Sequence, residues 1–191
     1  AYDLRNATER IVASPCEVMG RGFPYDLVMP QLLLDNGTRF DLDGVCREFV
    51  GEYKKNNSSA CSALIDCTQM EALAAAVKRV NTAGSQAVVL DNVQVYEGIS
   101  SRNNPTHIFY DLEDYVQQSC TDAQAVADFS AQLDRTVSSR YHTDTFYSAY
   151  NNRNNAINHY SGITTSAPIM LDAASQYRDE WQQTEWYKAT H

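Results

Sequence analysis

The sequence predicts an α/β fold in which helices cover both faces of a sheet. Residues 10–14 and 62–66 are short apolar runs, and runs of this length near turn formers are typical of buried strands. Longer segments follow them in which apolar residues recur every three or four positions, the period of a helix packed along one side. Strands and helices therefore alternate along the chain, which favours a sheet with helices packed on its faces.

The first strand, residues 10–14, ends at Pro15, because proline cannot donate a hydrogen bond to a sheet ladder. A loop follows, since Gly20, Gly22 and Pro24 disfavour both helix and strand. We expect a short helix over residues 25–34.

The clearest helix covers residues 42–53. Asp41 or Asp43 can cap its first turn, and Lys54 and Lys55 complement the dipole at its end. Its apolar residues are spaced by three and by one and form a single stripe: Leu42, Val45, Cys46, Phe49, Val50 and Tyr53.

The second strand, residues 62–66, leads into a helix that we expect to begin with a capping box between Thr68 and Glu71. The core face of this helix is predicted to be Met70, Leu73, Ala74, Val77 and Val80.

The rest of the chain gives weaker patterns. We expect a loop over residues 93–105, helices beginning near Asp111 and near Thr121, and an exposed loop at residues 151–155. A late strand over residues 157–167, broken at Gly162, and a closing helix with four aromatic residues complete the prediction. Those aromatic residues are Tyr177, Trp181, Trp186 and Tyr187.

Composition excludes several classes of function. The net charge is −9 and the 15 basic residues are scattered, so the average field repels nucleic acid. No apolar run reaches the roughly 18 residues of a membrane span. Histidines and acidic residues lack the spacing of a metal site, and no loop has the pattern that cradles phosphate. We therefore expect no cofactor and no metal.

The five cysteines show neither a C-x-x-C pair nor the spacing of a zinc site. Their odd number argues against a dense disulfide framework, so we expect most of them to be free and buried. Cys46 on a helix face and Cys61 in a strand read as small core hydrophobes. Twelve tyrosines, many asparagines and few lysines hint at an exported bacterial protein.

Cys67 is a candidate nucleophile, because it ends a strand where the following helix N-terminus would stabilise a thiolate. The structural alternative is that Asp66 caps the helix and Cys67 only occupies the boundary. The sequence cannot place His107, His142 or His159 beside this thiol, and we favour the structural alternative.

The loop that follows residues 10–14 is a better candidate for a binding site. It leaves the end of a strand, where α/β sheets bind ligands. Glycine on both sides of Arg21 allows a peptide backbone to approach and presents the Arg21 side chain. The alternative is an ordinary turn with an exposed arginine.

This region resembles a segment of the clostripain-family cysteine peptidases. Residues 1–6 (AYDLRN), 11–14 (IVAS) and 20–25 (GRGFPY) match a helix end, a strand and a glycine-x-glycine-aromatic loop that follow the family's Asp-x-Cys nucleophile motif. Residues 62–66, 109–112 and 185–190 agree in order with later parts of the family, so the resemblance covers most of the chain.

The resemblance implies a caspase-like or gingipain-like α/β fold and a cysteine endopeptidase. Both catalytic residues would lie upstream of Ala1, so residues 1–191 would be the C-terminal part of one peptidase domain, with 112–156 as a candidate helical or loop insertion. This chain alone would be inactive, and its partners would be a peptide substrate and the upstream segment or chain. The implied substrate-binding residues are Ser14, Pro15, Cys16, Gly20, Arg21, Gly22 and Tyr25.

Arg21 departs from the family's pattern. Family members specific for basic residues carry an acid between the two loop glycines, where it pairs with a substrate arginine or lysine. A guanidinium at this position would repel a basic side chain in a partly desolvated pocket. The expected P1 residue, on the N-terminal side of the cleaved bond, is therefore not Arg or Lys but acidic or neutral.

Three further expectations remain open. A start at Ala1 fits either a processed chain held to its partner by a shared sheet or an incomplete record, and the chain alone would expose an unpaired strand edge. A non-catalytic exported module that binds protein or glycan through residues 141–160 is the main alternative function. A self-sufficient hydrolase that uses Cys67 is the other.

Overall fold

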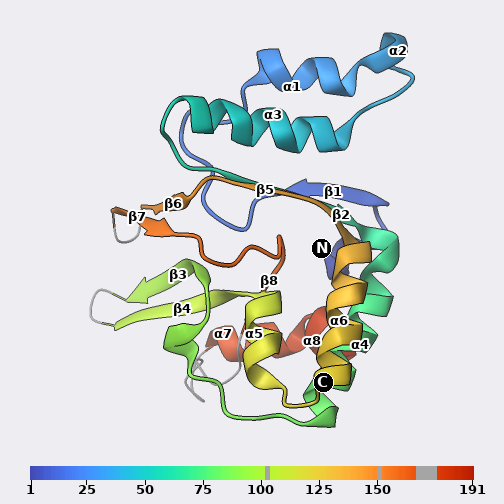
Figure 1. The fold of residues 1–191 in the computed structure, drawn as a ribbon, viewed down its shortest axis with the longest axis vertical. Coiled ribbons are helices and arrows are strands. Elements are labelled where there is room, and N and C mark those ends of the chain that lie inside the picture. Colours follow the sequence, from blue (N-terminus) through green and yellow to red (C-terminus); the bar gives the residue numbers. More distant parts are fainter. Residues whose placement is uncertain (102–103, 150–151, 167–175) are drawn as a thin grey trace.

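The central sheet of the computed structural model contains β1 (Arg10–Ala13), β2 (Cys61–Asp66) and β5 (Val137–His142). The structure describes residues 1–101, 104–149, 152–166 and 176–191 (Figure 1). β2 is the middle strand and pairs antiparallel with both neighbours. Among the described strands, β1 pairs with β2 alone, which leaves the other edge of β1 without a neighbour.

Two smaller sheets lie beside the central one, so the strands in the described ranges are divided among three sheets. One contains β3 (Val95–Ser101), β4 (Asn104–Asp111) and β8 (Thr164–Thr165), and the other is a hairpin of β6 (Thr145–Ser148) and β7 (Arg153–Ala156). The remaining elements are η1 (Tyr2–Leu4), α1 (Tyr25–Leu32), α2 (Leu34–Gly37), α3 (Leu42–Lys55), η2 (Cys67–Gln69), α4 (Met70–Ala83), η3 (Leu90–Asn92), α5 (Leu112–Ser119), α6 (Ala123–Thr136), α7 (Gln176–Gln183) and α8 (Glu185–Thr190).

Helix α3 covers one face of the central sheet, and α1 lies on its outer side (Figure 1). Asp41 caps α3, because its carboxylate accepts a hydrogen bond from the Gly44 amide at 2.8 Å. Five of the six residues of the predicted apolar stripe are buried, since Val45, Cys46, Phe49, Val50 and Tyr53 are all 6% exposed or less, whereas Leu42 in the first turn is only partly buried. Periodicity therefore placed this helix and its inner face correctly.

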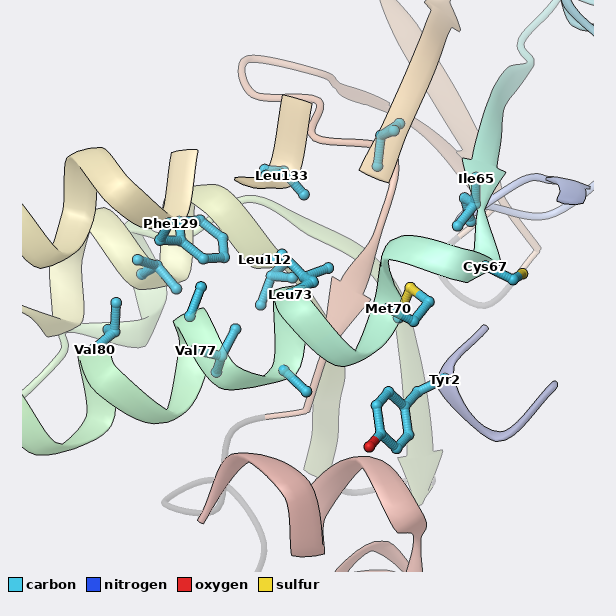
Figure 2. Close-up of a cluster of buried hydrophobic side chains, with 14 of the residues drawn as sticks. Tyr2, Ile65, Cys67, Met70, Leu73, Val77, Val80, Leu112, Phe129 and Leu133 are labelled. Carbon is cyan, nitrogen blue, oxygen red and sulfur yellow. The ribbon is translucent and has the colours of Figure 1, made fainter. Parts of the chain in front are cut away.

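The opposite face of β2 packs against α4 and α6 around the largest hydrophobic cluster. Figure 2 shows Leu112, Phe129 and Leu133 gathered around Leu73 and Val77 of α4. Helices thus cover both faces of the central strand, as the alternation of strand and helix predicted. At the far side of α4, Tyr2 packs edge-on against Trp186 with ring centroids 5.6 Å apart.

The predicted start of α4 was wrong. Asp66 rather than Thr68 acts as the cap, and its carboxylate accepts a hydrogen bond from the Thr68 amide at 2.9 Å within the short helix η2. The α-helix itself begins at Met70 without a side-chain cap. A 3-10 turn between strand and helix moves the cap upstream, because it satisfies the first amides before the α-helix starts.

The loop expected at residues 93–105 is instead part of a hairpin of β3 and β4. The pairing register shifts twice between Val95 and Gly98. Such bulges break the two-residue period by which a strand is recognised in a sequence. Tyr96 is fully buried.

Several late boundaries also differ from the expectation. The predicted strand over residues 157–167 is reduced to β8, and residue 167 lies outside the described residues. Residues 153–155 of the expected loop belong to β7, and the aromatic closing segment is two helices, α7 and α8. Gly162 explains the irregular stretch: its φ is +82°, and a Cβ built there would lie 2.7 Å from the Ala63 Cβ. The chain crosses the central strand too closely for a side chain.

In the described part of the chain, no helix is both long enough and apolar enough to cross a membrane.

Candidate substrate-binding site

The loop between β1 and α1, residues 14–24, lies on the surface of α3. Its tip is a turn in which the Gly22 amide donates to the Met19 carbonyl at 2.8 Å, with Gly22 at φ +70°. The Tyr53 hydroxyl donates to the Gly22 carbonyl at 2.8 Å, and Phe23 stacks on Phe49 with centroids 4.4 Å apart. The apolar stripe of α3 therefore holds the second half of the loop.

A pocket of about 290 Å³ opens where this loop meets α1 and α3. Its lining combines backbone, aromatic and charged groups: Arg21, Gly22, Phe23, Pro24, Tyr25, Asp26, Glu52 and Tyr53. The Tyr25 side chain is largely exposed, whereas Tyr53 is buried. Burial raises the pKa of the Tyr53 phenol, so this hydroxyl stays protonated and remains a hydrogen-bond donor.

Arg21 and Glu52 form an ion pair at the pocket. The Arg21 Nη2 lies 3.6 Å from the Glu52 Oε1, with side chains 66% and 21% exposed. The more exposed Asp26 is the second acid in the lining. The pocket thus contains one cation and two carboxylates, and the more sheltered carboxylate is already paired with Arg21.

A disulfide joins the first half of the loop to the central sheet. It connects Cys16 to Cys61 at the start of β2, with a Cα–Cα distance of 6.6 Å. The expectation that Cys61 is a free core thiol was therefore wrong. Antiparallel pairing of Ala13 with Ala63 brings the end of β1 beside the start of β2, and the two sulfur atoms therefore meet. The spacing of the cysteines in the sequence does not reveal this register.

The three remaining cysteines are free and buried, as expected for most of the five. Cys46, Cys67 and Cys120 are 0%, 2% and 6% exposed. Burial is the largest cause that raises the pKa of the Cys67 thiol, which disfavours the thiolate that a nucleophile requires. Within the described residues, no histidine forms a hydrogen bond with a free cysteine: His142 Nδ1 contacts the Thr143 carbonyl at 2.8 Å, and His159 Nε2 lies 3.9 Å from Asp114.

The structure divides the seven residues singled out in the sequence into two groups. Arg21, Gly22 and Tyr25 line the pocket, and Gly20 lies next to it in the exposed turn. The other three, Ser14, Pro15 and Cys16, lie at the opposite end of the loop and not in the lining. There the Ser14 hydroxyl donates to the Cys16 carbonyl at 2.8 Å.

Five further lining residues were not named as substrate-binding from the sequence: Phe23 and Pro24 lie within the candidate loop, Asp26 follows it, and Glu52 and Tyr53 belong to α3. Tyr53 was assigned only to the core stripe of its helix, although its hydroxyl reaches the loop. Glu52 gave no signal beyond its position next to that stripe. In the described part of the chain, no group of three or more His, Cys, Asp or Glu residues could hold a metal ion.

Comparison with known proteins gives a consistent result. The model of the clostripain family (peptidase C11) matches residues 1–191. A clostripain from Bacteroides thetaiotaomicron ATCC 29148, solved in complex with the peptide inhibitor BTN-VLTK-AOMK, shares 32% identity with a TM-score of 0.84, over 100% of this chain and 80% of that one. No curated protein matches the chain.

Two further solved structures have the same fold. A secreted C11 cysteine protease from Bacteroides thetaiotaomicron shares 31% identity at a TM-score of 0.85, over 100% of this chain and 51% of that one. An inactive zymogen C11 protease from Parabacteroides distasonis shares 23% identity at a TM-score of 0.83, which supports the fold alone, over 100% and 54%. The chain spans about half the length of these two solved chains.

Proposed function

Because the chain belongs to the clostripain family of cysteine peptidases, we propose that it forms the substrate-binding side of a cysteine endopeptidase. In this proposal, residues 1–191 are the C-terminal part of one caspase-like domain, and the nucleophilic cysteine and its histidine lie upstream of Ala1. A thiolate would attack the scissile carbonyl, the histidine would protonate the leaving amine, and backbone amides would hold the oxyanion. This chain alone would be inactive.

The observation that carries the proposal is the pocket between the β1–α1 loop, α1 and α3. It begins with a loop that leaves the end of a sheet strand, the usual position for ligands in α/β proteins. Buried thiols at Cys46, Cys67 and Cys120 support an upstream nucleophile, because none of them is accessible to a peptide. The edge of β1 that pairs with no described strand gives an upstream strand a place to join the sheet.

The charges of the pocket lead to a proposal about specificity. A basic P1 residue that enters it must lie beside the Arg21 guanidinium or displace Arg21 from Glu52. Either costs free energy in a partly desolvated site. The related clostripain was solved with a peptide, VLTK, that ends in lysine. We propose that the present enzyme differs from it and prefers a neutral or acidic P1 residue.

A P1-scanning library of fluorogenic peptides, applied to the complete enzyme, tests this specificity. We expect poor cleavage after Arg and Lys, and a gain of roughly tenfold or more in kcat/KM for basic substrates in Arg21→Asp. The matched control is Arg39→Asp, which also breaks an exposed arginine ion pair, with Asp35 at 3.3 Å, but outside the pocket lining.

Two outcomes would contradict the proposal at different levels. Strong selectivity of the unmodified enzyme for Arg or Lys would overturn the specificity and leave the peptidase intact. A complete protein that cleaves no peptide would overturn the peptidase and favour the non-catalytic binding module.

We also propose that the protein is exported. One relative is described as a secreted C11 protease, and disulfides such as Cys16–Cys61 persist in oxidising compartments rather than in the cytosol.

A further inference from the structure

The two halves of the β1–α1 loop are held in different ways. Phe23 and the Gly22 carbonyl are fixed on α3 by the Phe49 ring and the Tyr53 hydroxyl. The first half instead reaches the central sheet through the Cys16–Cys61 disulfide. Glu17 then accepts a hydrogen bond from the Ala149 amide, at the end of β6, at 2.8 Å.

Within the loop itself there is little to define its path. Between residues 14 and 23, the backbone hydrogen bond from Gly22 to Met19 is the one that the structure shows. Gly20 and Arg21 are exposed, and two glycines allow many backbone conformations. The shape of the pocket wall therefore depends on side-chain anchors, which are the Cys16 disulfide at one end, Phe23 at the other, and Met19 packed against the α3 cluster between them.

The disulfide anchor is built into the core. Cys16 is 7% exposed and Cys61 is fully buried, and both belong to a cluster with Tyr96, Phe146 and Ile157. The Ser14 hydroxyl lies over the bridge, 3.5 Å from the Cys16 sulfur and 3.7 Å from the Cys61 sulfur. A covalent bond between a surface loop and a fully buried strand end limits how far the loop can move.

We propose that the Cys16–Cys61 disulfide is a positioning element of the substrate pocket, which sets the height of the β1–α1 loop above the sheet. This inference rests on the proposed function, because the loop forms one wall of the proposed P1 pocket. Without the bridge the loop would sample positions that do not bind substrate. Binding would then weaken, while the reaction of bound substrate would change little.

The first test asks whether the bridge exists and holds the loop, and it needs no activity. The complete protein, taken from assay buffer, is alkylated with iodoacetamide and mapped by mass spectrometry without reduction. We expect a peptide that links Cys16 to Cys61, with Cys46 and Cys120 free. Alkylated Cys16 and Cys61 would overturn the proposal.

Trypsin then reports on the loop, because Arg21 is exposed within it and is followed by Gly22. We expect cleavage after Arg21 to be slow in the unmodified protein and roughly tenfold faster in Cys16→Ala/Cys61→Ala. The chain offers a closely matched control: Cys46→Ala/Cys120→Ala also removes two buried sulfur atoms, at 0% and 6% exposure, and should leave this rate unchanged. Equal cleavage rates in both double variants would overturn the proposal.

Kinetics of the complete enzyme make the final test. The bridge-free variant should show a KM raised roughly tenfold, with kcat within about threefold of the unmodified enzyme. Cys16→Ala and Cys61→Ala alone should each give the same effect as the double variant, since either breaks the same bond. An unchanged KM in an active bridge-free variant would overturn the positioning role alone. A complete protein without peptidase activity would overturn the proposed function, and the positioning role with it.

Discussion

The two faces of the central sheet differ in how much they bury. Among the described residues, sixteen buried ones form a single cluster on the α4 and α6 side, whereas the corresponding cluster on the α3 side has six. Large exposed hydrophobic side chains show the opposite distribution: of the seven in the part of the chain that the structure describes, five lie between residues 18 and 40, in the loop and helices on the α3 side. They are Val18, Tyr25, Met29, Leu33 and Phe40.

This difference separates the face that stabilises the fold from the face on which we propose that substrate binds. The α4 and α6 side, which we call the thick face, provides most of the apolar burial that stabilises the fold. The α3 side, which we call the thin face, carries the pocket, whose loop is held by a few specific contacts. Loops that bind ligands belong to the less stable parts of a protein. Changes on the two faces should therefore have different consequences.

The largest expected effect is on the thick face. Phe129 of α6 is fully buried, and Phe129→Ala should cost about 3–5 kcal/mol, from lost transfer free energy and a cavity that dense packing cannot close. Phe49→Ala, at 1% exposure on the thin face, should cost less, because the neighbouring loop can collapse into the space. Urea denaturation of the complete protein measures both. Equal losses of unfolding free energy in Phe129→Ala and Phe49→Ala would contradict the inferred difference between the two faces.

The next largest loss of stability is expected from substitution of glycine by alanine at two positions. Gly162→Ala should cost about 2–3 kcal/mol, because the residue has positive φ and its Cβ would meet Ala63 at 2.7 Å. Gly22→Ala has a similar φ of +70° but open space around its Cβ, so only the backbone cost of about 1 kcal/mol remains. Thermal unfolding ranks the two variants. If Gly22→Ala proves the more damaging to stability, the loop contributes more to the fold than we infer.

The smallest effect concerns the hydroxyl that holds the loop. Tyr53→Phe removes the 2.8 Å hydrogen bond to Gly22 and should cost about 0.5–1.5 kcal/mol. Because the folded-state pKa of this phenol is raised, its contribution is complete below pH 10 and decreases as pH rises through the folded pKa. Stability of the unmodified protein should thus decline more steeply above pH 10 than that of Tyr53→Phe. Parallel pH profiles would show that the phenol does not titrate differently on folding.

The sequence was sufficient to predict those helices and strands in which one physical signal dominated. The stripe of α3 and the apolar run of β2 were recognised because burial imposes a period or a length. The β3–β4 hairpin was missed because its bulges disturb that period. Asp66 was recognised as an alternative cap, but the short turn η2 that decides between it and Thr68 leaves no distinct pattern.

The candidate site was predicted only in part, for a different reason. Glycines around Arg21 mark a loop locally, so Arg21, Gly22 and Tyr25 could be found from the sequence. Glu52 and the partner of Cys16 depend on contacts between distant segments. An odd number of cysteines does not show which two meet, whereas the antiparallel register of β1 and β2 does.

The hydrogen bond between Glu17 and Ala149 joins residues 132 positions apart. At a synthesis rate of about 5–20 residues per second, Ala149 is made roughly 7 to 26 s after Glu17. The start of the pocket loop therefore exists for many seconds before its last anchor does. The anchor at Ala149 therefore forms only after the 131 residues between it and Glu17 have been made.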